Sequence, residues 1–93
     1  MPTLRFVERA LDRLRAGEPL LQEYLEGDII ELFEVLAMND KLEEFQFLAN
    51  YVNEYNPKIL DYMLYSITRY PTSLPPYGRD PFLSIIHKHV NPK

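Results

Sequence analysis

The chain has 93 residues, a length that fits one domain with one compact core. Ten Lys and Arg residues stand against fourteen Asp and Glu residues, and the net charge of −4 disfavours a nucleic-acid partner, because phosphates repel an acidic protein. The absence of cysteine excludes disulfides and thiolate metal sites, and it leaves the cellular compartment open.

The pattern of apolar residues argues against a membrane protein. No apolar run approaches the roughly 20 residues needed to cross a bilayer. The chain opens with an amphipathic segment instead of the apolar core of a signal peptide. We therefore predict a soluble chain without a membrane partner.

The first half of the chain predicts four helices. Thr3 is placed to cap a helix over 4–16, and Gly17 supplies its stop. A short second helix follows over 20–25 and is expected to end at Gly27. Asp28 is expected to cap a third helix over 29–38, and a tight turn at 39–40 leads into a fourth over 41–55. The third and fourth helices are expected to form an antiparallel hairpin.

The second half predicts two further helices separated by prolines. Asn56 and Pro57 are typical of a helix start, so a helix is expected over 58–70. Asp80 is expected to cap a last helix over 81–90. The sequence thus predicts a single all-α domain over 1–93: a compact bundle of five to six short helices with a proline-rich strap (69–82) before the last helix.

The strap is the segment that helical periodicity does not explain. It holds four of the eight prolines of the chain. We expect a rigid segment that crosses the helices, anchored by Leu74, Tyr77 and Phe82, with the prolines lowering the entropy lost on ordering. The alternative is an exposed linear motif for a host factor, because 70–74 resembles a short viral recruitment motif and 74–77 resembles a ligand of WW domains. The residues of the strap or motif are Tyr70, Pro71, Leu74, Pro75, Pro76, Tyr77 and Phe82.

No pattern in the sequence indicates catalysis, a cofactor or a small-molecule substrate. A glycine-rich phosphate loop and a nucleophile elbow are both missing. His87 and His89 lie about 200° apart around a helix axis, which does not suit a shared metal ion. We therefore expect neither an enzyme nor a metal site.

Tyrosines indicate an interaction surface instead. The fourth and fifth predicted helices carry more aromatic surface than one small core readily buries, and tyrosine is enriched at protein interfaces. The leading hypothesis is a non-enzymatic assembly module whose partner is a second copy of itself, bound through an apolar, tyrosine-rich helix face. The candidate residues are Tyr51, Tyr55, Tyr62 and Tyr65.

A nucleic-acid-binding regulator is the competing hypothesis. Arg5, Arg9 and Arg13 recur at helical spacing and form a basic face. Glu8 and Asp12 lie in the same helix and are placed to neutralise it, so this partner is the less favoured one.

The order of residues from about 28 to 93 resembles the N-terminal all-helical domain of the arthropod hemocyanin, prophenoloxidase and hexamerin superfamily. Three sets of helical residues carry the resemblance: Leu32, Phe33, Val35 and Leu36; Phe45, Ala49, Tyr51 and Glu54; Tyr62, Leu64 and Tyr65. A Leu-Pro-Pro-Tyr loop follows them, with Leu74, Pro75, Pro76, Tyr77 and then Pro81. His89, Val90 and Asn91 match the end of the domain.

The chain also departs from that family. Thr68, Arg69 and Tyr70 stand where a His-Arg pair is usual, the loop is shorter, and no phenylalanine lies between Phe6 and Phe33. The resemblance implies that copper and oxygen bind in a different, histidine-rich domain. For this chain it implies packing, subunit contacts and regulation.

Overall fold

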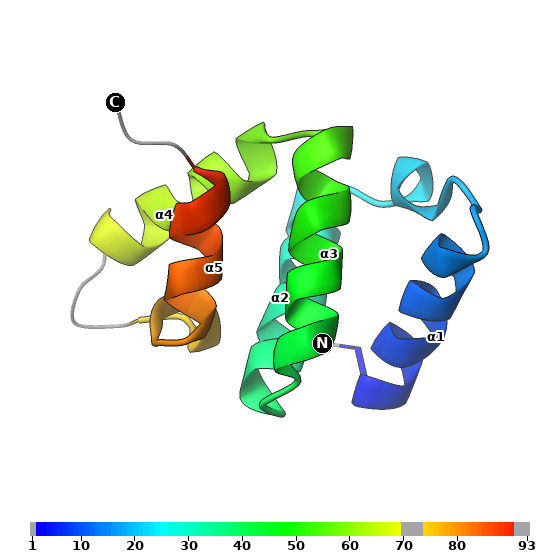
Figure 1. Cartoon of the computed structure of the whole chain (residues 1–93), viewed down its shortest axis with the longest axis horizontal. Helices are drawn as coiled ribbons and strands as arrows, with labels where there is room; N and C mark the ends of the chain where they lie inside the picture. Colours follow the sequence, from blue (N-terminus) through cyan, green and yellow to red (C-terminus); the bar gives the residue numbers. More distant parts are fainter. Residues whose placement is uncertain (1, 70–73, 91–93) are drawn as a thin grey trace.

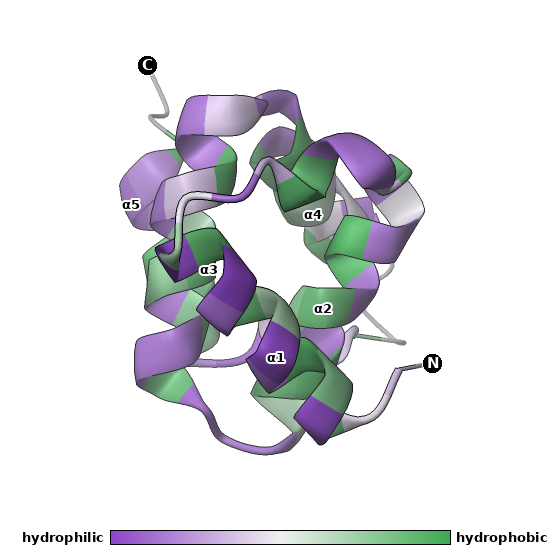
Figure 2. Ribbon diagram, turned by 90° about the vertical axis from the view of Figure 1, so that its right-hand side faces the viewer, coloured by the Kyte–Doolittle hydropathy of each residue, from purple (hydrophilic) through white to green (hydrophobic). Residues whose placement is uncertain are grey.

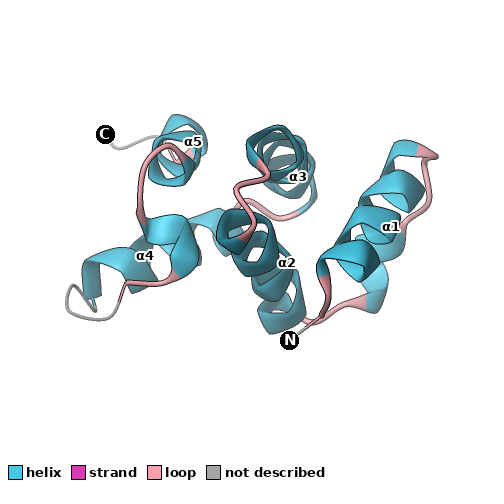
Figure 3. Cartoon of the chain, turned by 90° about the horizontal axis from the view of Figure 1, so that it is seen from below, coloured by secondary structure: helices cyan, strands magenta, loops and turns pink. Residues whose placement is uncertain are grey.

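A helical hairpin occupies the middle of the molecule, and the remaining helices flank it on both sides (Figure 1 and Figure 3). The structure is a computed structural model that describes residues 2–69 and 74–90. Within these residues there are five α-helices, two 3₁₀ turns and no strand. The helices are α1 (Leu4–Arg15), α2 (Glu26–Met38), α3 (Leu42–Tyr55), α4 (Lys58–Arg69) and α5 (Phe82–His89), and the 3₁₀ turns are η1 (Leu20–Glu23) and η2 (Pro76–Gly78).

Helix α1 begins and ends as the sequence predicts. The Thr3 hydroxyl accepts a hydrogen bond from the Phe6 backbone N–H at 3.1 Å, which satisfies one of the free donors of the first turn. Gly17 has a φ of +89°, the left-handed conformation that glycine adopts without strain. The N–H of Gly17 then donates to the Leu14 carbonyl and the N–H of Glu18 to the Arg13 carbonyl, which closes the helix.

The start of α2 differs from the prediction. The second predicted helix is a single 3₁₀ turn, and α2 begins at Glu26, so Gly27 lies inside its first turn instead of ending the preceding element. Asp28 is not the cap: its carboxylate accepts a hydrogen bond from the Leu25 N–H at 3.3 Å. A carboxylate at the third helical position can satisfy the same free donors from within the helix, which is why the sequence pattern was misleading here.

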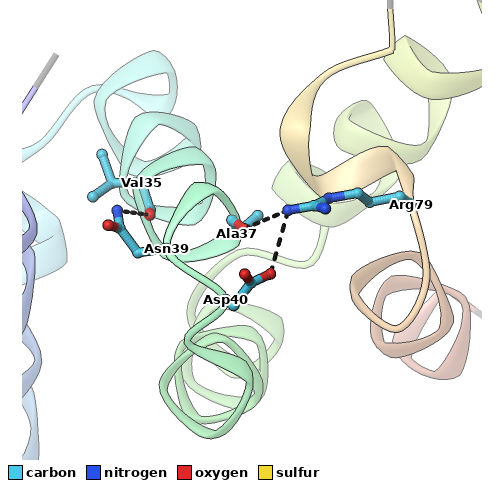
Figure 4. A network of polar contacts seen from close by, with 5 residues as sticks. All are labelled: Val35, Ala37, Asn39, Asp40 and Arg79. Carbon is cyan, nitrogen blue, oxygen red and sulfur yellow. Dashed lines mark hydrogen bonds and ion pairs between the residues drawn. The ribbon is translucent and has the colours of Figure 1, made fainter.

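The turn at 39–40 is confirmed and reverses the chain between α2 and α3. Asp40 has a φ of +55°, a conformation that aspartate tolerates better than most residues. The N–H of Lys41 donates to the Leu36 carbonyl at 2.9 Å, and the Asn39 side-chain amide donates to the Val35 carbonyl at 2.8 Å (Figure 4). The terminal carbonyls of α2 are thereby satisfied within the turn.

Helix α4 begins as predicted and α5 does not. The Asn56 side chain accepts from the Lys58 N–H at 3.3 Å, as expected of the Asn-Pro pair. Asp80 was expected to cap α5, but its carboxylate accepts from the Ser84 hydroxyl at 2.7 Å. Pro81 immediately precedes Phe82, the first residue of α5, and provides no side-chain cap. The aspartate is thus occupied by a side chain one turn further along.

The strap is tied to the end of α2 by Arg79. Its guanidinium donates to the Ala37 carbonyl at 3.1 Å and forms an ion pair with Asp40 at 3.4 Å (Figure 4). A cation suits this position because the carbonyls at a helix C-terminus carry partial negative charge. Arg79 therefore fixes the strap against the central hairpin.

Three phenylalanine rings form the centre of the core. The ring centroid of Phe45 in α3 lies 5.0 Å from that of Phe33 in α2 and 4.9 Å from that of Phe82 in α5. Aliphatic residues from every α-helix surround them, and Figure 2 shows hydrophobic residues concentrated where the helices face one another. The all-α helical bundle expected from the sequence is confirmed. No described helix is long and apolar enough to cross a membrane.

Truncating the central ring is expected to destabilise the fold strongly. Phe45→Ala removes a fully buried side chain that contacts two other rings, so we expect a loss of about 3–5 kcal/mol in the free energy of unfolding. Met38→Ala, at a position 56% exposed, is the matched control and should cost less than about 1 kcal/mol. Urea denaturation followed by circular dichroism measures both. Equal losses in the two variants would contradict the central position of Phe45.

Candidate interaction surfaces

Two of the three expected anchors of the strap are buried and one is not. Tyr77 and Phe82 are almost completely buried, as predicted. Leu74 is 53% exposed, so the expectation that it anchors the strap is wrong. Its inner side rests above Gly78, where an added Cβ would lie 3.4 Å from a Leu74 methyl group and 3.5 Å from Ile67. The shallow space over a glycine covers only half of the leucine.

The remaining strap residues bear on the linear-motif hypothesis. Pro75 and Pro76 are half-buried, whereas Tyr70 and Pro71 lie outside the described residues. A WW domain binds an extended, accessible segment through the faces of its prolines and aromatic ring. The buried ring of Tyr77 offers no such face in this conformation.

The most exposed tyrosine pair lies on α4. Tyr62 and Tyr65 are 56% and 52% exposed, and their ring centroids are 6.4 Å apart. The Arg69 guanidinium lies 5.8 Å from the Tyr65 ring centroid, one turn further along the helix. Helix α4 thus presents aromatic rings and a cation on its solvent side.

The other two candidate tyrosines lie on α3. Tyr51 is half-buried and its ring is tilted toward that of Phe47, with ring centroids 6.1 Å apart. Arg15 at the end of α1 covers the Phe47 ring at 4.6 Å from its centroid. Tyr55 is exposed near the end of the helix. Among the described residues, one aromatic contact joins Tyr62 to Tyr65 and another joins Tyr51 to Phe47, and none joins the α3 tyrosines to the α4 pair.

The basic face of α1 is partly neutralised. Arg5 and Arg9 are exposed, but Arg13 pairs with Glu18 at 3.0 Å and lies 3.9 Å from Glu23. The hydrogen bond and charge of Glu18 raise the pKa of Arg13. One of the three predicted cations is therefore already engaged by two acidic side chains, which weakens the case for a phosphate-binding stripe.

The sequence pattern missed a hollow beside Phe6. Phe6 is 48% exposed and lies off the buried stripe of α1. A hollow of about 210 Å³ is lined by Pro2, Phe6, Tyr24, Asp28, Glu31 and Leu32. The only signal in the sequence is a phenylalanine out of register with its helical stripe, and that signal does not indicate which element lies opposite.

Three titratable groups with shifted pKa values lie in the strap, in α2 and in α5: Tyr77 is buried, and Glu34 and His89 are half-buried. Burial, followed by the nearby charge of Glu34, raises the pKa of Tyr77 to about 12. Burial and Glu31 also raise the pKa of Glu34. His87 is exposed, whereas His89 buries its Nε2 atom without a hydrogen-bond partner among the described residues. Those residues contain no cluster of three or more His, Asp or Glu side chains placed to hold a metal ion.

Ionisation of Tyr77 is expected to destabilise the protein in alkali. The folded-state pKa of about 12 exceeds the usual value near 10. The contribution of Tyr77 to the free energy of unfolding is therefore fully present below about pH 10 and is lost as the pH rises toward 12. Tyr77→Phe should remove this part of the alkaline decline, and Tyr62→Phe, on the solvent side, should retain it. Urea midpoints between pH 8 and pH 11.5 measure the difference. If the urea midpoint fell equally with pH in wild type and Tyr77→Phe, the burial of the Tyr77 hydroxyl would not be the cause of the decline.

Protonation of His89 is expected to destabilise the protein in acid. Burial and then Lys88 lower its pKa below the usual value of about 6.5, so the folded state binds the proton less readily than the unfolded chain. The contribution of His89 to the free energy of unfolding should be fully present above about pH 6.5 and should be lost as the pH drops through the folded-state pKa. His89→Phe should flatten this decline relative to wild type, while His87→Phe keeps it. Thermal unfolding between pH 5 and pH 8 tests the pair, and an unchanged slope in His89→Phe would contradict the expectation.

Comparisons with known proteins identify no relative of this chain. No family model, no curated protein and no solved structure matches this chain. The resemblance to the N-terminal domain of the hemocyanin superfamily therefore stays a prediction from the residues alone.

Proposed function

We propose that this chain is a non-enzymatic assembly module that associates with a second copy of itself through the α4 face, which we define as Asp61, Tyr62, Tyr65 and Arg69. All four side chains are exposed. The observation that carries the proposal is the Tyr62–Tyr65 pair, two large rings more than half exposed on one helix. Tyrosine favours interfaces because its ring gains from burial while its hydroxyl keeps a polar partner.

The strap that follows α4 carries a further exposed apolar side chain, Leu74. Leu74 is 53% exposed, and its inner side packs over Gly78, where an added Cβ would also contact the buried Ile67 of α4. Exposed aromatic and aliphatic side chains therefore occur on neighbouring segments. Clustered apolar surface of this kind is typical of protein-binding sites, whereas single exposed apolar residues are common everywhere.

The placement of the titratable groups supports a role without catalysis. Catalytic acids and bases usually combine a shifted pKa with a position in a cleft. Glu34, Tyr77 and His89 have shifted pKa values. None of these three residues lines the hollow beside Phe6.

Absolute mass in solution tests the proposal. Light scattering after size exclusion, over about a hundredfold range of concentration, should show a species heavier than the 11.0 kDa chain. Tyr65→Glu should shift it toward the monomer, because a charge placed among buried rings loses its hydration. Tyr55→Glu makes the same change at an exposed tyrosine of α3 and should leave the mass unchanged.

Two results would contradict this proposal. A wild-type chain that stays monomeric at every concentration would exclude self-association. Equal dissociation by Tyr65→Glu and Tyr55→Glu would remove the contact from the α4 face. Circular dichroism of each variant confirms that the helices are retained.

A further inference from the structure

The exposed side of α4 carries a pattern that is complementary to itself. Asp61, Tyr65 and Arg69 are spaced four residues apart and all are exposed. Successive members of such a row are displaced by only about 40° around the helix axis, so the three share one face. Tyr65 lies at the middle, with the carboxylate about 6 Å toward one end of the helix and the guanidinium about 6 Å toward the other.

A two-fold axis through Tyr65 would exploit this symmetry. In most symmetric dimers the same patch on both copies forms the contact, so each residue faces its counterpart across the axis. We infer that two copies of this chain pair through antiparallel α4 helices, with Tyr65 on the two-fold axis and Asp61 of each copy facing Arg69 of the other. The inference rests on the proposed self-association and adds its direction and register.

Charge selects the antiparallel arrangement over the parallel one. In the parallel arrangement, Asp61 would face its own counterpart and Arg69 would do the same, which places like charges together at both ends of the contact. In the antiparallel arrangement, each end carries one opposite-charge pair. Charged residues at an interface act mainly by this kind of discrimination between orientations, since wrong pairings are costly.

Among residues 2–69 and 74–90, no ion pair engages either charge of this row. The ion pairs of the described residues join Arg13, Arg15 and Arg79 to acidic partners, and they include neither Asp61 nor Arg69. The Arg69 guanidinium lies over the Tyr65 ring, which keeps it on the same face as the tyrosine. Helix α4 also lies at the opposite end of the molecule from α1, so a partner on this face need not meet α1 (Figure 1 and Figure 3).

Charge reversal tests the facing pairs. Asp61→Arg and Arg69→Asp should each raise the dimer dissociation constant about tenfold, because each variant creates two like-charge contacts in the symmetric dimer. The double variant Asp61→Arg with Arg69→Asp restores two opposite-charge pairs and should return to within about threefold of wild type. Glu43→Arg, an exposed reversal at the start of α3, is the control and should have no effect. Sedimentation at low salt measures all four constants.

A single cysteine tests the position of the axis. Because the chain has no cysteine, Tyr65→Cys introduces one thiol, and oxidation of the protein should give a disulfide-linked dimer. Tyr55→Cys, at an exposed position on α3, is the control and should remain mostly monomeric after the same treatment. Electrophoresis without reducing agent distinguishes the two.

The outcomes separate this inference from the proposed function. The antiparallel pairing would be overturned if both charge reversals left the dimer dissociation constant unchanged. It would also be overturned if the single variants weakened the dimer and the double variant did not restore it. Self-association itself would stand in either case. Equal cross-linking at positions 65 and 55 would overturn the placement of the axis. A monomeric wild-type chain would overturn both the pairing and the proposed function.

Discussion

The contacts among the rings of Phe33, Phe45 and Phe82 fix α5 against the central hairpin, although α4 and the strap separate them in sequence. Phe33 and Phe45 join the two helices of the central hairpin, and Phe82 brings α5 onto it after the strap. Edge-to-face rings gain more than their buried area alone provides, because the positive edge of one ring meets the negative face of another. With Phe82 in the core, η2 at the end of the strap packs against α2, and α5 packs against α3 and α4.

Features set by near neighbours could be predicted from the sequence. Thr3, Gly17, Asn56 and the turn at 39–40 act through hydrogen bonds that span only a few residues, so local pattern was enough to place them. The same reasoning was wrong at two aspartates. Asp28 and Asp80 both have a side chain that can cap a helix. Asp28 instead lies inside α2 and accepts from the Leu25 N–H, and Asp80 accepts from the Ser84 hydroxyl. Residue type alone does not distinguish these uses.

Features set by distant neighbours could not be predicted. Helical periodicity shows which residues of one helix share a face, but it does not show how that face is turned toward another helix. Tyr51 and Tyr62 therefore belonged to one predicted surface, whereas the structure joins them to different aromatic partners on different helices. Leu74 was expected to anchor the strap and is instead half exposed, because the space over Gly78 accommodates only its inner side.

The contact between Arg79 and the end of α2 has a consequence for the order of folding. It joins residues 42 positions apart, whereas the turn it braces is made by bonds between residues only a few positions apart. Closing a long loop costs chain entropy before its contacts are gained. The hairpin of α2 and α3 therefore forms at a lower cost in chain entropy, and the strap and α5 dock onto a turn that has already formed. The earliest structure in the folding chain should then be the middle of the sequence, with both ends added to it.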